Sequence, residues 1–533
     1  MAAAGDYAWR VLALATVDGP LPKLGVVVVA LLAAGAMLLR APRPRALFTL
    51  GALALAPVLL LAEIWHAPQL RFVHQHPLMA IGAALLALAV LGAASFGLAR
   101  ARWLVAPLSL AALPFRVPIA AGGSTADLLV PLYLVITAGA LAASVPALRA
   151  GGAREQPGGS TATGEGSSDG RPRGRDGRWS LLEWALAGYL VLYAVQALYS
   201  VGFEKALQNV VFFYVPFALL FAQLRELRWE GDLVRGCLAL ETALAVIFAA
   251  IGFGEYATGT LLLNPKLIAS DELHPYFAVN SVFYDPDIFG RFLALVMTLL
   301  AAALIWARSR RLALSVTFVL AVLWCGLLLT LSRSSLGALL VGLAALYALR
   351  WRLWPVLGAG AAVIAVGLVA LAISPTTFGL NQGLNGASSG RASLITGGGA
   401  MFEQRPLVGY GSGAFVTEYR RQYPQAASGV SASHTIPVTI AAEQGAVGLA
   451  AYLVLLASAL VVLLRRARGD PARAAVAAAF LALLFNTMLY ADFLEDPTTW
   501  ALLAIGIALA RRREELAPAG AAREPSSAAP VTA

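Results

Sequence analysis

The chain has 533 residues, of which 59% are hydrophobic and 13% are charged, and its mean hydropathy is +0.75. A soluble protein of this size could not bury so much apolar surface, whereas a bilayer replaces the missing polar exterior. The net charge of +10 would also suit nucleic acid, but the arginines cluster in short gaps between apolar runs, as in cytoplasmic loops of membrane proteins. The composition therefore excludes a soluble enzyme and argues against nucleic acid as a partner.

Apolar runs along the chain predict an all-α fold. A span needs roughly 20 apolar residues, so we expect a polytopic transmembrane helical bundle of about 12–15 spans with one large extracytoplasmic loop. The run 103–121 is the least regular, because it contains three prolines. The runs lie at 24–40, 46–64, 78–99, 103–121, 127–148, 180–200, 206–224, 233–253, 286–307, 312–331, 335–350, 353–373, 437–464, 474–490 and 497–511.

Basic clusters between these runs predict the orientation in the membrane. With the spans above, every cluster falls on the same side, which we take as cytoplasmic; examples are Arg40 to Arg45, Arg308 to Arg311 and Arg511 to Arg513. We expect a multi-pass protein of the inner (plasma) membrane. The opposite side holds the long polar loops and all the histidines, which are His66, His74, His76, His274 and His434.

Composition shifts divide the chain into six segments. Residues 150–179 are rich in Gly, Ser and Arg and cannot form a core, so we expect a disordered cytoplasmic linker. The expected segments are a front transmembrane bundle (1–149), this linker (150–179), a second transmembrane bundle (180–373), a large extracytoplasmic loop (374–436), C-terminal transmembrane helices (437–511) and a disordered cytoplasmic tail (512–533).

An arginine stands at an outer helix end in the sequence Ser-Arg-Ser-Ser at 332–335. Arg333 runs against the positive-inside bias, so it needs either a route to the lipid headgroups or an anionic partner. Paired guanidinium N–H groups suit phosphate, and Ser334 or Ser335 can cap a helix whose N-terminus adds further donors. Arg333 is therefore either a snorkelling residue or an anion-binding residue.

A second arginine follows Asp285-Pro286, a pair typical of a helix start. Arg291 then lies about one and a half turns into the membrane, where a functional role is the default for a charged residue. The D-x-D of Asp285 and Asp287 could hold a divalent ion, but helix capping explains it more simply, and we predict no metal. Arg116, among prolines at another outer end, is a weaker candidate for lining a polar cavity.

The extracytoplasmic loop carries a glycine-rich stretch at 406–415 (PLVGYGSGAF), which includes Tyr410. No strand precedes it, so tight turns with close backbone approach are a better interpretation than a dinucleotide site. His434 lies just before a long apolar helix and is either solvated or a proton acceptor for a hydroxyl. Glu443 falls inside that helix, where a carboxylate more often has a structural role.

These pieces, in this order, resemble the O-antigen ligase and polymerase family. Its members share Asp-Pro-Asn opening a span, Arg-Ser at an outer helix start, and a periplasmic loop with an arginine, a Pro-Leu-x-Gly-x-Gly-x-Gly-x-Phe motif and His-Asn. The resemblance covers roughly 200–505, and Asp287, Ile395 and Thr435 depart from the pattern. The matching positions are Arg333, Arg391, the glycines of 406–415, His434, Glu443, Gly445 and Gly448.

The resemblance implies glycan transfer from an undecaprenyl-diphosphate carrier to an acceptor hydroxyl on a glycan, lipid or protein, outside the cytoplasm, by an inverting glycosyltransferase without cofactor or metal. His434, Arg333 and Arg291 are the expected catalytic residues. A polymerase that joins lipid-linked repeat units shares these motifs and stays open as an alternative. A lipid or polysaccharide transporter is a further alternative, although the ionisable groups gather at the outer face. The expected substrate-binding residues are Arg391, Arg116, Ser334, Tyr410 and Glu443.

Overall fold

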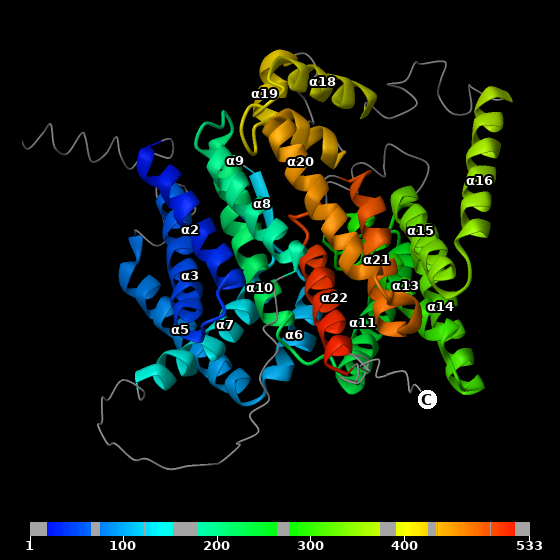
Figure 1. The fold of residues 1–533 in the computed structure, drawn as a ribbon, viewed down its shortest axis with the longest axis horizontal. Helices are drawn as coiled ribbons and strands as arrows, with labels where there is room; N and C mark the ends of the chain where they lie inside the picture. The colour runs from blue at the N-terminus through cyan, green and yellow to red at the C-terminus, as the bar shows by residue number, and fades with distance from the viewer. Residues whose placement is uncertain are drawn as a thin grey trace, which may run out of the picture.

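The computed structural model describes residues 19–64, 75–121, 124–152, 180–263, 277–373, 391–424, 433, 435–490 and 492–516. Within them the fold is the predicted all-α bundle, with one short hairpin in addition (Figure 1). The first part of the chain forms α2 (Pro20–Leu38), α3 (Pro42–Ile64), α5 (Pro77–Arg100), α6 (Val105–Ala112), β1 (Val117–Ala121), β2 (Ser124–Leu128) and α7 (Val130–Gly152).

The rest of the described chain is helical. It forms α8 (Leu181–Ala197), α9 (Phe203–Gln208), a π-helical turn (Asn209–Tyr214), α10 (Val215–Leu224), α11 (Gly231–Thr258), α13 (Pro286–Ile305), α14 (Arg310–Leu329), α15 (Arg333–Arg350) and α16 (Leu353–Ile373). The last helices are α18 (Arg391–Gln404), α19 (Phe415–Gln422), α20 (Ile436–Leu464), α21 (Pro471–Thr487) and α22 (Pro497–Leu516).

Membrane-spanning character is clear from length and hydropathy. Nine helical segments among the described residues are long and apolar enough to cross a bilayer, and four shorter apolar helices accompany them. Helix α5 is almost wholly apolar, yet Leu98 is its single buried residue. Its other apolar side chains therefore face outward, where lipid would surround them in a membrane. The chain is thus a multi-pass membrane protein, as predicted.

The prediction of one span over 103–121 is wrong. Helix α6 ends at Ala112, and the chain continues into an antiparallel hairpin in which Val117 pairs with Leu128. Pro114 has no N–H to continue the helical hydrogen bonds, and Pro118 locks an extended-compatible φ within β1. The prolines noted in the sequence therefore end the helix instead of merely bending it.

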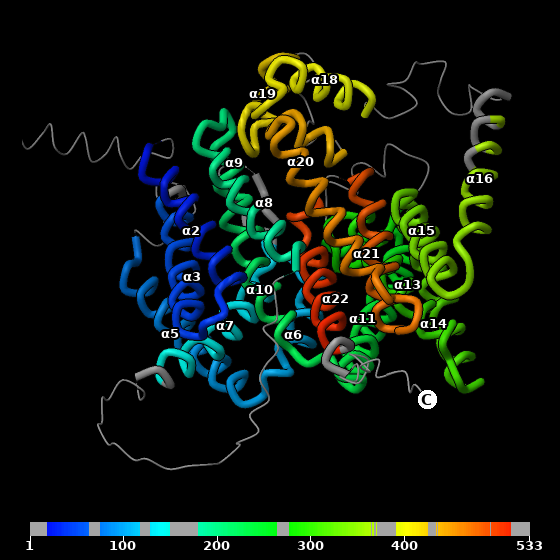
Figure 2. Tube along the Cα trace, in the orientation of Figure 1, coloured from blue at the N-terminus to red at the C-terminus, as the bar shows by residue number. Residues whose placement is uncertain are grey.

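The front helices and the later helices share one hydrophobic core. Helix α2 packs against α8 and α10, and α10 also packs against α22 (Figure 2). Glu183 of α8 lies in this core and pairs with Arg225 at 2.7 Å and with Arg511 of α22 at 2.7 Å. The Arg225 guanidinium also donates to the Met37 carbonyl of α2. Buried charge is tolerated here because each group has a partner.

The bundle has two distinct ends. Helices α18 and α19 lie across one of them, which we call the outer end, while α22 ends at the opposite, inner end (Figure 1). The basic turns near Arg45, Arg102 and Arg228 belong to the inner end, where they line one cavity. The outer end therefore corresponds to the side predicted to be extracytoplasmic.

Candidate functional site

The outer ends of α13 and α15 interlock through hydroxyl and carboxylate groups. Asp285 caps α13 by accepting from the Asp287 N–H at 2.7 Å, and Ser332 caps α15 by accepting from the Ser335 N–H at 3.2 Å. The Asp287 carboxylate accepts from the Ser332 hydroxyl and, at 3.2 Å, from the Ser334 hydroxyl. Asp285 thus caps α13, and Asp287 joins α13 to α15. Burial of the Asp285 carboxyl, together with the nearby negative charge of Asp287, raises the pKa of Asp285.

Arg291 is buried one turn below this junction and is held by two carboxylates. Its Nη1 and Nη2 donate to Asp492 at 2.7 and 3.0 Å, and Nη2 lies 3.1 Å from Asp496. The guanidinium lies over the Tyr490 ring, 5.6 Å from its centroid, and the Tyr490 hydroxyl donates to Asp285 at 2.9 Å. Arg291 therefore fixes the α21–α22 turn against α13, and its charge is already neutralised by the protein.

Three other predicted arginines differ from Arg291. Arg333 is exposed in the first turn of α15, and Arg116 and Arg391 are half-buried. Within the described part of the chain, none of the three forms an ion pair or a hydrogen bond with another side chain. Their guanidinium groups therefore remain available for an anionic ligand.

The glycine loop, residues 406–415, docks into a break in α20. At Gly445 the backbone has φ 65° and ψ −163°, so the helical hydrogen bonds are interrupted there. The loop replaces them, because Ala446 N–H donates to the Pro406 carbonyl at 2.7 Å and the Glu443 carbonyl accepts from Gly411 N–H at 2.7 Å. This pairing satisfies backbone groups that would otherwise be unpaired inside the bundle.

Glu443 secures the other end of the same loop. Its buried carboxylate accepts from Gly413 N–H at 2.8 Å and from Phe415 N–H at 2.9 Å, which is the first residue of α19. Tyr410 is also buried, and its hydroxyl donates to Gln404 of α18 at 2.5 Å. Glu443 and Tyr410, two of the five predicted substrate-binding residues, thus hold the loop, α18 and α20 together.

A small polar cavity of about 130 Å³ lies under the glycine loop. Its walls include Lys205, Asn209, Thr439, Glu443 and Glu495. Asn209 belongs to the π-helical turn and donates to Glu495 at 2.7 Å, while its own Oδ1 is buried without a partner among the described residues. Burial raises the pKa of Glu495, and the Lys205 ammonium opposes this shift.

His434 itself lies outside the described residues, whereas Ser433 and Thr435 on either side of it are described. Ser433 is buried and donates to the Thr435 carbonyl at 2.7 Å, and its hydroxyl lies 2.6 Å from that of Thr439. Ile436 and Thr439, in the first turn of α20, line the polar cavity. The first turn of α20 therefore lies at the cavity under the glycine loop.

A second cavity of about 730 Å³ follows the bundle from its outer to its inner end. Arg116, Arg291 and Asp496 line its outer part, and Asp470 and Arg512 line its inner part. Apolar side chains of α6, α11, α13, α21 and α22 form most of the wall between them. The structure thus brings Arg116 and Arg291, which are far apart in the sequence, to one cavity.

Sequence reasoning did not single out several polar residues of these sites. Asp492, Glu495 and Asp496 lie in the short stretch between the predicted spans 474–490 and 497–511. A buried arginine requires a carboxylate partner, so the position of Arg291 in a span predicted that an acidic residue lies close to it in the fold. Asn209 lies inside the predicted run 206–224 and Lys205 directly precedes it, so both gave a weaker signal. In the part of the chain that the structure describes, no group of three His, Cys, Asp or Glu residues is arranged to hold a metal.

The glycine loop docks on α20 at Gly445, and both belong to a segment that matches a known family. Residues 318–453 match the O-antigen ligase family. The match confirms the predicted resemblance over about a quarter of the chain, from α14 into α20. It supports a membrane glycosyltransferase-like enzyme with a role in cell-surface glycan transfer or polymerisation. A search of curated proteins finds no match to the chain.

The segment that matches the O-antigen ligase family contains only part of the arrangement described above. Arg333, Arg391, the glycine loop, His434 and Glu443 fall inside it. Outside it are Arg116, Arg291 and the α21–α22 turn. This turn is bonded to α13 through Arg291, and its Glu495 lines the cavity under the glycine loop. The matched segment therefore shares the cavity under the loop with residues that precede and follow it in the chain, such as Lys205 and Glu495.

Proposed function

We propose that this protein transfers a glycan from a polyprenyl-diphosphate carrier to an acceptor hydroxyl at the outer face of the membrane. The observation that carries the proposal is the long cavity of about 730 Å³ with Arg116 at its outer part and an apolar wall below. A polyprenyl chain is apolar and a diphosphate is anionic, so the two halves of this donor match the two parts of the cavity. The match to the O-antigen ligase family supports the same substrate class.

The arginines would serve different purposes. Arg116, Arg333 and Arg391 have no carboxylate partner among the described residues, so they are the groups we assign to the diphosphate. Departure of the diphosphate concentrates negative charge on the leaving group, and fixed guanidinium groups stabilise that charge most in the transition state. Arg291, neutralised by Asp492 and Asp496, would position the wall of the cavity instead of binding the leaving group.

His434 is the residue we assign to the acceptor. The acceptor oxygen would attack the anomeric carbon while its proton passes to the neutral imidazole, and the bond from that carbon to the diphosphate oxygen would break. The polyprenyl diphosphate would keep the electron pair, and the anomeric configuration would invert in this single displacement. Nothing in these steps requires a metal.

The test uses the purified full-length protein with a polyprenyl-diphosphate glycan and candidate acceptors, followed by mass analysis of the products. Arg116→Gln and His434→Ala should each reduce transfer by on the order of 100-fold or more, the range for losing an electrostatic or general-base contribution. Arg352→Gln, an exposed inner-end arginine, is the matched control and should retain activity. Full activity of both Arg116→Gln and His434→Ala would refute the assignment.

A polymerase is the second candidate, because the family match supports either activity. The two differ in the acceptor, which is a finished lipid or protein for a ligase and another carrier-bound repeat unit for a polymerase. The same assay separates them. Products that grow by whole repeat units from the carrier-linked donor alone would identify a polymerase, and a single transfer to an added acceptor would identify a ligase.

A further inference from the structure

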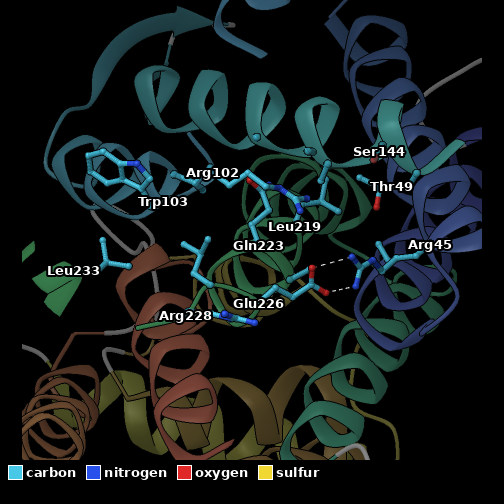
Figure 3. Close-up of a pocket in the computed structure, with 18 of the residues that line it drawn as sticks. Arg45, Thr49, Arg102, Trp103, Ser144, Leu219, Gln223, Glu226, Arg228 and Leu233 are labelled. Atoms are coloured by element: carbon cyan, nitrogen blue, oxygen red, sulfur yellow. Dashed lines mark hydrogen bonds and ion pairs between the residues drawn. The ribbon is translucent and has the colours of Figure 1, made fainter. Parts of the chain in front are cut away.

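The inner end of the bundle contains a cavity of about 860 Å³ that the proposed transfer reaction does not use (Figure 3). It lies between the front helices α3, α6 and α7 on one side and α10 and α11 on the other. Much of its wall is made of small residues, such as Ala36, Ala46, Ala140 and Ala147. Because these side chains are small, they do not fill the space between the helices, and the cavity results from this packing.

Charged side chains at this cavity are unevenly paired. Arg45 and Glu226 form a two-bonded ion pair within it (Figure 3). Asp232 pairs with Arg235, which lies one turn further along α11. Arg102 and Arg228 also line the cavity, and within the described ranges neither has an ion-pair or hydrogen-bonding side-chain partner. Among the described residues that line the cavity, the guanidinium groups of Arg102 and Arg228 thus remain against the carboxylate of Glu230.

We propose that this cavity binds the phosphate headgroup of an anionic phospholipid between Arg102 and Arg228. Guanidinium groups form paired, charge-assisted hydrogen bonds with phosphate, and basic pockets between transmembrane helices at the cytoplasmic side suit anionic headgroups. Leu219 and Leu233 join the alanines in an apolar wall that would accommodate an acyl chain. A free phosphate shares the headgroup chemistry but would leave this apolar wall exposed to water.

The position of the cavity gives the bound lipid a structural consequence. Arg102 comes from the front helices, whereas Arg228 precedes α11 in the later part of the chain. A phosphate held by both would join the two sets of helices at the inner end. The Arg45–Glu226 pair, which links α3 to the turn after α10, makes the same connection from within the protein.

Native mass spectrometry of the detergent-purified full chain, supplied with phosphatidylglycerol or phosphatidylcholine, tests the proposal. Wild-type protein should retain phosphatidylglycerol in preference to phosphatidylcholine. The double variant Arg102→Gln/Arg228→Gln should lose on the order of tenfold or more of this retention. Arg308→Gln/Arg352→Gln is the matched control, because it removes the same charge from exposed inner-end positions outside the cavity and should retain the lipid.

Three outcomes would overturn the proposal. Equal retention of phosphatidylglycerol by both double variants would show that the cavity is not the site. Equal retention of the two lipids by wild-type protein would show that the headgroup charge is not recognised. Displacement of the lipid by millimolar inorganic phosphate would show a free-anion site instead. Unchanged elution and melting temperature of Arg102→Gln/Arg228→Gln establish that any loss of lipid is not a loss of fold.

Discussion

Gly445 of α20 lies directly against Leu407 of the glycine loop, so closely that a Cβ added at Gly445 would come within 2.4 Å of the Leu407 carbonyl carbon. The contact is backbone against backbone, and no side chain can move aside to relieve it. It couples the interruption of a membrane-embedded helix to the loop that covers the polar cavity. The geometry of the outer end therefore depends on the absence of a side chain at one position.

Gly445→Ala should separate the loop from α20. Its φ of 65° with ψ −163° is a region used almost only by glycine, and a side chain there costs about 1–3 kcal/mol before the contact with Leu407 is counted. We expect a lower melting temperature and faster proteolysis within 406–415. Gly448→Ala is not a neutral control, because Gln444 crowds it, so Gly188→Ala, which meets no neighbour, serves instead. Equal behaviour of the two variants would contradict the docking.

Glu443→Ala should loosen the same loop from its other end. The substitution leaves the Gly413 and Phe415 N–H groups without their acceptor, at about 1–3 kcal/mol for each buried group. Glu443→Gln keeps one carbonyl acceptor and should lose less stability. If Glu443 instead acts only on substrate, both variants would melt like wild type while activity falls, so melting and transfer assays together distinguish the two roles.

Arg291→Gln should destabilise the outer end by about 3–5 kcal/mol, because it leaves the charges of Asp492 and Asp496 close together and uncompensated. The double variant Arg291→Gln/Asp496→Asn removes one of those charges and should recover part of the loss. Thermal unfolding in detergent measures both. A double variant no more stable than the single one would mean that the ion pairs do not hold the α21–α22 turn.

Glu495 should make stability depend on pH. Burial raises the pKa of Glu495 in the folded state, so the folded protein holds a proton that the unfolded chain releases. Its favourable contribution is therefore present at low pH and is lost as the pH rises above the ordinary glutamate value of about 4.3. Glu495→Gln should melt higher than wild type at neutral pH and show a flatter pH profile, whereas Glu204→Gln, an exposed control, should keep the wild-type profile.

Helix positions were the most predictable part of the fold, because they depend on local hydropathy. The runs predicted at 286–307 and 312–331 correspond closely to α13 and α14. The run 103–121 failed because hydropathy does not register the backbone hydrogen bond that a proline removes. The hairpin that follows α6 also depends on pairing between strands, which an apolar run does not encode.

Contacts between distant residues were the unpredictable part of the site. The sequence indicated that Arg291 requires a partner, but Asp492 lies 201 positions away and only the fold brings the two together. The glycines of 406–415 were correctly interpreted as sites of close backbone approach, since Gly411 lies against Ser200. Which segment approaches them could not be derived from spacing, nor could the two hydrogen bonds that occupy Glu443.

The triple junction of Glu183, Arg225 and Arg511 has a consequence for biogenesis. Glu183 is in α8, yet one of its two guanidinium partners belongs to α22, which is synthesised more than 300 residues later. Until α22 has inserted, Glu183 lacks its second guanidinium partner, and the side of α10 that packs against α22 stays open to the bilayer. A chain that stops short of Arg511 would thus display an unfinished interior to membrane proteases, even if every earlier helix had inserted correctly.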